Sequence, residues 1–459
     1  MTAPTTPLEI PLPDPLATAR LDALLARLDG AAQGVPLNRL DLGGMQAGGD
    51  TLARRRNGVV EAPAWWDGEL GGLKLEGADL RGARLQGTDF GRANLDRAHL
   101  AGASARLLRA DGARLEGADL TGADLGGASF QGVVAGEASF AEVLGEDANF
   151  SHASMRFARF TGASLDGAVF DDADLWGVDF SGADADGTSF RQARLDEADL
   201  SNVNLTGANF VEASLRHAKL TGSRLKGANL SGAALDGADL SGADLTNVTL
   251  VRIDLSSCNL RGARFAGSWL SETRLRVEQI GEAVGEELAR DYATAEAAYK
   301  VLERNFVSLG AKDEAGWAYR KGRRMGRSHA AAQARHAWRA RDPRGFCQHG
   351  YRWLADRFVE WLCDYGESLS RIARAFAVLI LVFAALYGLS AGLIADGAPT
   401  RDLLDLLSYS ALNMLTANPP DIGFKPVGRF TNALVAGQGA VGIVLMGLFG
   451  FVLGNRLRR

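Results

Sequence analysis

A strict five-residue period runs through the chain from Leu75 to Leu275. The stretch GADLSGADLTNVTL, residues 237–250, shows a repeat that fits neither an α-helix, with 3.6 residues per turn, nor a simple β-strand, with two. Of the 41 positions 75, 80, 85 and onward to 275, 36 hold Leu, Phe or Met, and the position two earlier is usually Ala. Residues two apart share a face of an extended segment, so the pattern predicts short strands that bury one side.

The chain must turn a corner between pentads, because the next inward residue, the small one, comes three positions after the large one. Gly often stands two positions after the large residue, where a tight turn demands a positive φ. Asp or Asn commonly precedes the large residue and can hydrogen-bond to nearby backbone. The pattern therefore predicts a closed prism with an apolar interior. We expect under-filled or locally kinked coils where the large inward residue is replaced by a small one, at Ala105, Ala110, Ala135, Gly145 and Ala185.

These A(D/N)LxG units resemble the pentapeptide-repeat family. The resemblance implies an all-β fold over residues 71–278, a right-handed quadrilateral β-helix with four pentads per coil. About ten coils at a strand spacing near 4.8 Å would make a rod of roughly 50 Å. A proline-rich N-terminal tail and cap, residues 1–70, would precede it. Cys258 stands at an inward Ala position and is interpreted as a small buried residue rather than a reactive thiol.

Acidic residues dominate one part of the repeat. Residues 116–186 hold 14 acids, and their only bases are Arg156 and Arg159. One interpretation is a binding face for a basic protein partner, which the sequence does not identify. The simpler one is that Asp is preferred beside each turn, so the acidity is a by-product of the architecture. Some soluble family members mimic DNA and bind type II topoisomerases, which gives a third hypothesis for this chain. The segments C-terminal to the repeat disfavour it, and nucleic acid is not an expected partner.

A helical, basic connector is expected at residues 279–345. Between Arg320 and Arg344 there are nine Lys or Arg and a single acid, Asp342. This block could bind nucleic acid or anionic lipid, or could be the solvated face of a helix. Residues 346–374 come next as an amphipathic helix with aromatic anchors at helical spacing. Because this helix runs into an apolar segment, we expect it to lie along the cytoplasmic membrane surface.

Two long runs near the C-terminus contain no charged residue. Residues 375–395 comprise 21 such positions, enough at 1.5 Å per residue to cross about 30 Å of hydrocarbon, and residues 430–455 comprise 26. Arginines lie before the first run and after the second, at Arg371, Arg374, Arg456, Arg458 and Arg459. The positive-inside rule then predicts a multi-pass protein with both termini in the cytoplasm. Its expected location is the bacterial inner (plasma) membrane.

Between these runs lies an apolar segment that is too short to cross the bilayer. We expect a helix over residues 401–416, capped by Thr400 and stopped by Pro419 and Pro420. Such a helix can enter the membrane and return on the same side if protein or a water-filled cavity satisfies the next stretch of backbone. The sequence therefore predicts a re-entrant helix.

The order of span, short helix, irregular segment and span over residues 375–459 resembles the two-transmembrane pore domain of the potassium-channel superfamily. The resemblance implies an ion channel-like protein that conducts monovalent ions and assembles as a homo-oligomer, a tetramer, within the lipid bilayer. It places candidates for the pore constriction at Thr416, Ala417, Asn418, Asp421, Gly423 and Phe424, and candidates for the pore lining or hinge at Gly437, Gly439 and Gly442. The stretch TANPPDIGF stands where the family has a TVGYG-type filter, so only weak cation selectivity is expected.

No catalytic, cofactor-binding or metal site is expected. GLSAG at 388–392 and GQGAVG at 437–442 match enzyme motifs in form, but both lie in membrane-length apolar runs without the strand that those motifs need. The three cysteines are scattered without CxxC spacing. Besides the channel, one alternative is a membrane-anchored pentapeptide-repeat scaffold without conduction, and the topoisomerase-binding protein is the other.

Overall fold

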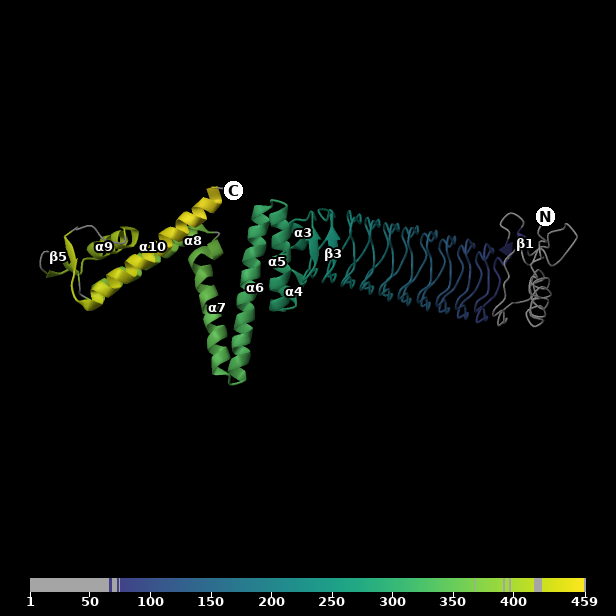
Figure 1. Cartoon of the computed structure of the whole chain (residues 1–459), viewed down its shortest axis with the longest axis horizontal. Coiled ribbons are helices and arrows are strands. Elements are labelled where there is room, and N and C mark those ends of the chain that lie inside the picture. The colour runs from purple at the N-terminus through teal and green to yellow at the C-terminus, as the bar shows by residue number, and fades with distance from the viewer. Residues whose placement is uncertain are drawn as a thin grey trace, which may run out of the picture. The chain divides into compact units, whose positions relative to one another are not determined.

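We describe a computed structural model of the chain, covering residues 66–67, 72–73, 75–366, 368–390, 393–395, 398–416 and 423–457. The chain divides into two compact units, Met1–Gly310 and Ala311–Arg459. Figure 1 shows the first as a stack of coils that ends in helices, and the second as a helical unit. The tail and cap predicted at 1–70 lie outside the described residues, apart from the short strand β1 (Trp66–Asp67), which pairs antiparallel with β2 (Gly72–Leu73).

The first unit is built from parallel β-bridges between residues twenty positions apart. The series begins with Asp79 and His99 and continues to Asp254 and Arg274, so four pentads complete each coil. Strands β3 (Thr249–Val251) and β4 (Trp269–Ser271) keep this parallel register. Each coil therefore forms its backbone hydrogen bonds with the coil above and the coil below, as in other β-helical stacks.

Each corner of the coil is a tight turn. The amide of Ala83, for example, donates to the carbonyl of Leu80 at 3.0 Å, and Gly82 between them has a φ of 60°. Asp89, just before a large inward residue, accepts the amide of Gly91 at 2.9 Å. The turn roles predicted for Gly and Asp are thus both seen. The Asp contact also supports the view that acidity accompanies the turns.

Phenylalanine rings fill the middle of the coil interior. Rings one coil apart stack, as for Phe150 and Phe170, whose centroids lie 4.8 Å apart with an interplanar angle of 7°. Rings half a coil apart meet edge to face, as for Phe160 and Phe170 at 5.5 Å and 88°. Both arrangements are favoured by the ring quadrupole. The twenty-residue coil thus places aromatic rings in direct register.

The backbone is not kinked at the small inward positions, so that part of the expectation is wrong. At Gly145 the ladder continues through a 2.7 Å hydrogen bond from its amide to the carbonyl of Ser164. A Cβ on Gly145 would lie 3.0 Å from Cδ2 of Leu165, which occupies the space beside it. Cys258 is buried as predicted. Its thiol donates to the carbonyl of Leu235 at 3.0 Å, and burial raises the pKa of the thiol to about 12.

Three helices close the C-terminal end of the coil: α3 (Val277–Ile280), α4 (Gly285–Leu288) and α5 (Tyr292–Ser308). Glu286, only 3% exposed, accepts the amides of Phe265 at 2.8 Å and Ala266 at 2.7 Å through its Oε1 atom. In the regular coil, an inward amide such as that of Leu260 donates to a carbonyl of the following turn of chain, here that of Gln279, so the amide of Phe265 would donate to the next coil if the repeat continued. The Glu286 carboxylate takes the place of that coil.

Helix α5 belongs to the same unit as the coil. Its Asn305 donates to the carbonyl of Thr273 at 2.9 Å, and its Tyr299, Leu302 and Phe306 are fully buried. The compact unit therefore runs to Gly310, and it includes the first part of the connector predicted at 279–345 as well as the coil. The five-residue period ends before α5, so periodicity alone could not show that this helix packs against the coil.

We expect the stability of a 71–310 fragment to depend on the protonation of Glu286. Burial raises the pKa of this carboxyl above its ordinary value of 4.5. The stabilisation tied to its proton is therefore present below pH 4.5 and lost as pH rises through the higher folded-state pKa. Glu286→Gln, which keeps an acceptor and cannot ionise, should gain stability relative to wild type as pH rises.

Urea unfolding from pH 4.5 to 8 checks this expectation, and a constant difference between the two proteins would contradict it. Glu286→Ala is the matched variant, because it leaves the amides of Phe265 and Ala266 without an acceptor. Because neither Ala nor Gln ionises, Glu286→Ala should be less stable than Glu286→Gln by about 1–3 kcal/mol at every pH.

The second unit contains a long helical hairpin followed by the apolar helices and a small sheet. Its elements are α6 (Lys312–Arg339), α7 (Pro343–Cys363), the 3-10 turn η1 (Asp364–Gly366), α8 (Leu369–Ser390), β5 (Leu393–Ala395), β6 (Ala398–Pro399), α9 (Leu403–Thr416), β7 (Phe424–Pro426) and α10 (Arg429–Leu457).

Two predicted helix ranges need correction. The amphipathic helix predicted at 346–374 ends at Cys363, because Asp364 and Tyr365 take left-handed φ values of 48° and 59°. Helix α8 begins at Leu369, before the apolar run 375–395. It also ends before the run does, at Ser390, because residues 393–395 form β5. The short helix predicted at 401–416 corresponds to α9.

Candidate functional site

The short helix α9 lies between two helices that are long and apolar enough to span a membrane, Leu369–Ser390 and Arg429–Gly454. At 14 residues α9 is only about 21 Å long. Its apolar contacts to both neighbours include Tyr387 of α8, which meets Tyr409 of α9 edge to face at 5.4 Å. Helix α9 therefore packs one side against both neighbours and is too short to reach from end to end of either helix.

A buried polar cluster joins these three helices; we call it the amide cluster and define it as Tyr387, Ser410, Asn413 and Gln438. All four residues are 0% exposed. The Oε1 atom of Gln438 accepts from the hydroxyl of Tyr387 at 2.6 Å and from Nδ2 of Asn413 at 3.0 Å. Its Nε2 donates to the carbonyl and hydroxyl oxygens of Ser410, at 2.9 and 2.7 Å. One amide of α10 thus holds both other helices.

The C-terminal part of α9 contacts α10 near the middle of α10. Gly442 is buried there, and a Cβ at this position would overlap the carbonyl oxygen of Met414. A larger residue at 442 would push the two helices apart. The two other glycines predicted to line or hinge the pore differ from each other. Gly439 is buried, whereas Gly437 is exposed and a Cβ added to it would meet no atom within 4 Å.

The next described element after α9 is β7, which lies at the end of the helices from which α9 starts. Strand β7 pairs with β5, which comes after α8, with Ile394 opposite Lys425. Phe424, a predicted constriction residue, packs its ring against Tyr409 at 6.4 Å. Gly423 precedes β7 with a φ of 87°, and Thr416 ends α9 with its hydroxyl bonded to the carbonyl of Leu412 at 2.7 Å. The other three constriction candidates, Ala417, Asn418 and Asp421, lie outside the described residues.

The basic block of the connector is partly neutralised inside the hairpin. Three arginines of α6 pair with acids of α7 and η1: Arg323 with Asp356, Arg324 with Glu360 at 3.0 Å, and Arg327 with Glu360. Arg324 also lies 3.5 Å from Asp364. These arginines therefore serve the α6–α7 contact. For these three arginines, the role in helix contact replaces the two interpretations given for the basic block, a solvated helix face and a surface that binds nucleic acid or lipid.

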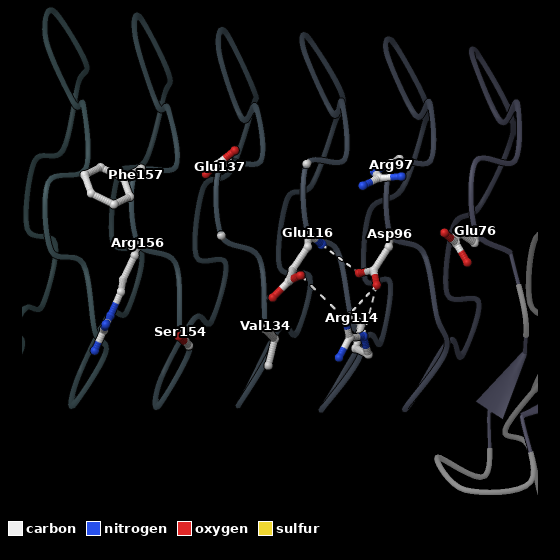
Figure 2. Close-up of a pocket in the computed structure, with 12 residues that line it drawn as sticks. Glu76, Asp96, Arg97, Arg114, Glu116, Val134, Glu137, Ser154, Arg156 and Phe157 are labelled. Carbon is white, nitrogen blue, oxygen red and sulfur yellow. Dashed lines mark hydrogen bonds and ion pairs between the residues drawn. The ribbon is translucent and has the colours of Figure 1, made fainter.

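An open groove of about 560 Å³ crosses one face of the coil. Figure 2 shows it running from Glu76 past Arg114 and Glu116 to Arg156, with acidic and basic side chains both along it. Arg114 binds Asp96 at 2.8 Å and Glu116 at 3.5 Å. Its far end is bordered by Phe157, a phenylalanine that remains 47% exposed. The groove is therefore lined by both acidic and basic side chains and is not a purely acidic surface.

The amide cluster was not predicted, although the sequence contains a signal for it. Ser410, Asn413 and Gln438 are polar residues within apolar stretches, and such residues in membrane-like segments face neighbouring helices far more often than lipid. Within the described residues, no group of three His, Cys, Asp or Glu side chains could hold a metal ion.

The fold of the first unit belongs to the class of stacked β-coils, and its sequence identifies the kind. The family described as Pentapeptide repeats matches in six segments, 74–106, 109–143, 146–182, 177–210, 208–247 and 238–276. Residues 74–276 are therefore a pentapeptide-repeat domain, which confirms the resemblance for this part of the chain.

Two solved structures are similar to part of this chain, and one of them, HetL, is a pentapeptide-repeat protein. HetL, involved in heterocyst differentiation regulation in the cyanobacterium Nostoc sp. strain PCC 7120, is 26% identical over 55% of this chain and 94% of its own, with a TM-score of 0.24. Full-length QnrB1, a plasmid-mediated fluoroquinolone resistance protein, is 24% identical over 46% of this chain and 99% of its own, with a TM-score of 0.27. No curated protein matches the chain.

Proposed function

We propose that the chain is an ion channel-like membrane protein whose pentapeptide-repeat domain is a cytoplasmic sensing or docking module. The observation that carries the proposal is the path of α9. It starts beside the β5–β7 sheet, reaches the middle of α10 at Gly442, and the chain is back at the sheet by Phe424. A short helix that enters the membrane between two spans, reaches its middle and is followed by a return of the chain to the same side is the arrangement expected of a pore loop.

The rest of the proposal draws on this path and on the channel resemblance. A two-span subunit cannot enclose a pore alone, so we propose a homo-oligomer, a tetramer by that resemblance, in the bacterial inner membrane with both termini cytoplasmic. The resemblance to the pentapeptide-repeat family likewise supplies the right-handed sense of the coil. The carboxyl end of α9, at Thr416, points its partial negative charge into the membrane, which favours monovalent cations.

Planar-bilayer recording on the purified full-length protein tests the proposal. We expect a weak cation preference with poor discrimination between potassium and sodium. Asp421→Asn should shift the reversal potential in a salt gradient toward the anion side, and Lys425→Ala should shift it the other way, because each changes the charge of the same return segment. Asp402→Asn, an exposed acid at the start of α9, is the matched control and should shift it less. Failure to conduct, or unchanged reversal potentials in both variants, would refute this assignment.

A second candidate function is a membrane-anchored scaffold without conduction, and the groove in Figure 2 favours it. The acidic and basic side chains that line the groove offer a protein partner polar contacts, and the exposed Phe157 offers an apolar one. Membrane retention of a protein that carries no current in any lipid would favour the scaffold over the channel.

A further inference from the structure

Helix α7 turns its acids toward α6 and its aromatic residues away from it. Its only acids, Asp356 and Glu360, are 8% and 9% exposed and pair with arginines of α6. The residues on its opposite side are open: Tyr351 is 76% exposed, Leu354 59% and Phe358 55%. This is the reverse of a helix whose apolar side packs on its neighbour.

The exposed side of α7, which we call the aromatic face, consists of Cys347, Tyr351, Leu354, Phe358 and Trp361. These residues are three or four apart and therefore share one side of the helix. The charged residues left exposed on α7 are all bases: Arg344, Arg352 and Arg357. The guanidinium of Arg357 lies 3.5 Å from Glu360 but keeps 62% of its side chain exposed.

We propose that the aromatic face docks on the surface of an anionic lipid bilayer. The inference rests on the proposed membrane location of α8 and adds a second, peripheral contact to it. Aromatic side chains flanked by arginines, without exposed acids on the helix, have the chemistry of a helix that lies in the headgroup layer. Figure 1 shows α6 along one side of α7 and the apolar helices extending from its other side.

The contacts between α7 and the first proposed span, α8, favour a lipid bilayer over a soluble protein as the partner of the aromatic face. Arg371, in the first turns of α8, donates to the carbonyl of Glu360 at 2.9 Å and lies 3.3 Å from Asp364. The start of the span is thus tied to the end of α7, and a bilayer that receives α8 lies next to the aromatic face.

Lipid-borne quenchers can test the proposal on the full-length protein in vesicles. Cys258 and Cys363 are buried and Cys347 is exposed, so a fluorophore can be attached at Cys347 on the aromatic face. Two comparison proteins carry Cys347→Ser together with Gln333→Cys, an exposed position on α6, or Leu381→Cys, an exposed position in α8. Each is measured with a bromine quencher near the headgroup and with one near the acyl-chain end.

We expect the label at 347 to be quenched several-fold more than the label at 333, and more strongly by the shallow quencher. The label at 381 should respond more to the deep quencher. Quenching at 381 without quenching at 347 would overturn the docking of α7 and leave the proposed spans intact. No quenching at either site would overturn both.

The anionic requirement is tested by comparing neutral vesicles with vesicles that contain phosphatidylglycerol. Removing two arginines with Arg344→Gln and Arg357→Gln should lower the ratio of docked to undocked α7 by about fivefold per arginine. The matched pair Arg335→Gln and Arg339→Gln, exposed on α6, should change it little. Equal quenching at 347 in both lipids, or equal effects of the two pairs, would overturn the role of anionic lipid.

Discussion

Leu205→Asp is expected to unfold the repeat domain. Leu205 is 0% exposed at a large inward position, where no cation or water could reach a carboxylate. An unpaired buried charge of this kind costs about 4 kcal/mol or more, which is a large part of the stability of a single domain. Far-UV circular dichroism and size-exclusion chromatography of a 71–310 fragment would show the loss of ordered β-structure.

Lys226→Asp is the control for Leu205→Asp, because it introduces the same side chain at an exposed corner of the coil. Its melting curve should overlap that of the unmodified fragment. If Leu205→Asp folded with near wild-type stability, the large positions of the pentad would not point inward and the interior would have to be assigned again.

Gln438→Leu is expected to loosen α9 from both long helices. The substitution keeps an apolar side chain of similar length but removes four hydrogen bonds, to Tyr387, Asn413 and both oxygens of Ser410. Buried polar groups that lose their partners in a bilayer have no water to replace them. We expect a loss of about 2–4 kcal/mol, measured by SDS unfolding of the full-length protein in mixed micelles.

Asn432→Leu is the matched control for Gln438→Leu, because it also replaces an amide on α10 but at an exposed position. It should leave the SDS midpoint within a few tenths of a kcal/mol. Equal effects of the two substitutions would mean that hydrophobicity, and not the amide cluster, determines the stability of the helical unit.

The sequence predicted the repeat domain well because the information is local. Each pentad carries its own inward residue, turn residue and Asp or Asn, so Leu80, Gly82 and Asp89 could be given their roles without knowledge of distant residues. The apolar runs were found for the same reason, since length and lack of charge are properties of a single segment.

Features that depend on two distant segments were missed or misplaced. Nothing near Glu286 in the sequence indicates that it ends the coil, because its partners, the amides of Phe265 and Ala266, are set by the coil itself. The basic block looked unpaired because Asp356 and Glu360 lie on the next helix. The amide cluster joins three helices, and no spacing rule relates Tyr387, Asn413 and Gln438.

The twenty-residue coil also limits how the repeat domain can change in length. Removing one full coil, such as residues 191–210, would shorten the stack by about one strand spacing and leave every later residue on its original face. Removing a single pentad, such as 191–195, would move each later residue by a quarter of a coil onto the neighbouring face. The column of stacked aromatic rings would then be interrupted, because Phe210 would no longer lie over Phe190. Insertions and deletions that preserve surface sites are therefore expected in multiples of four pentads, so that the domain changes in length by whole coils.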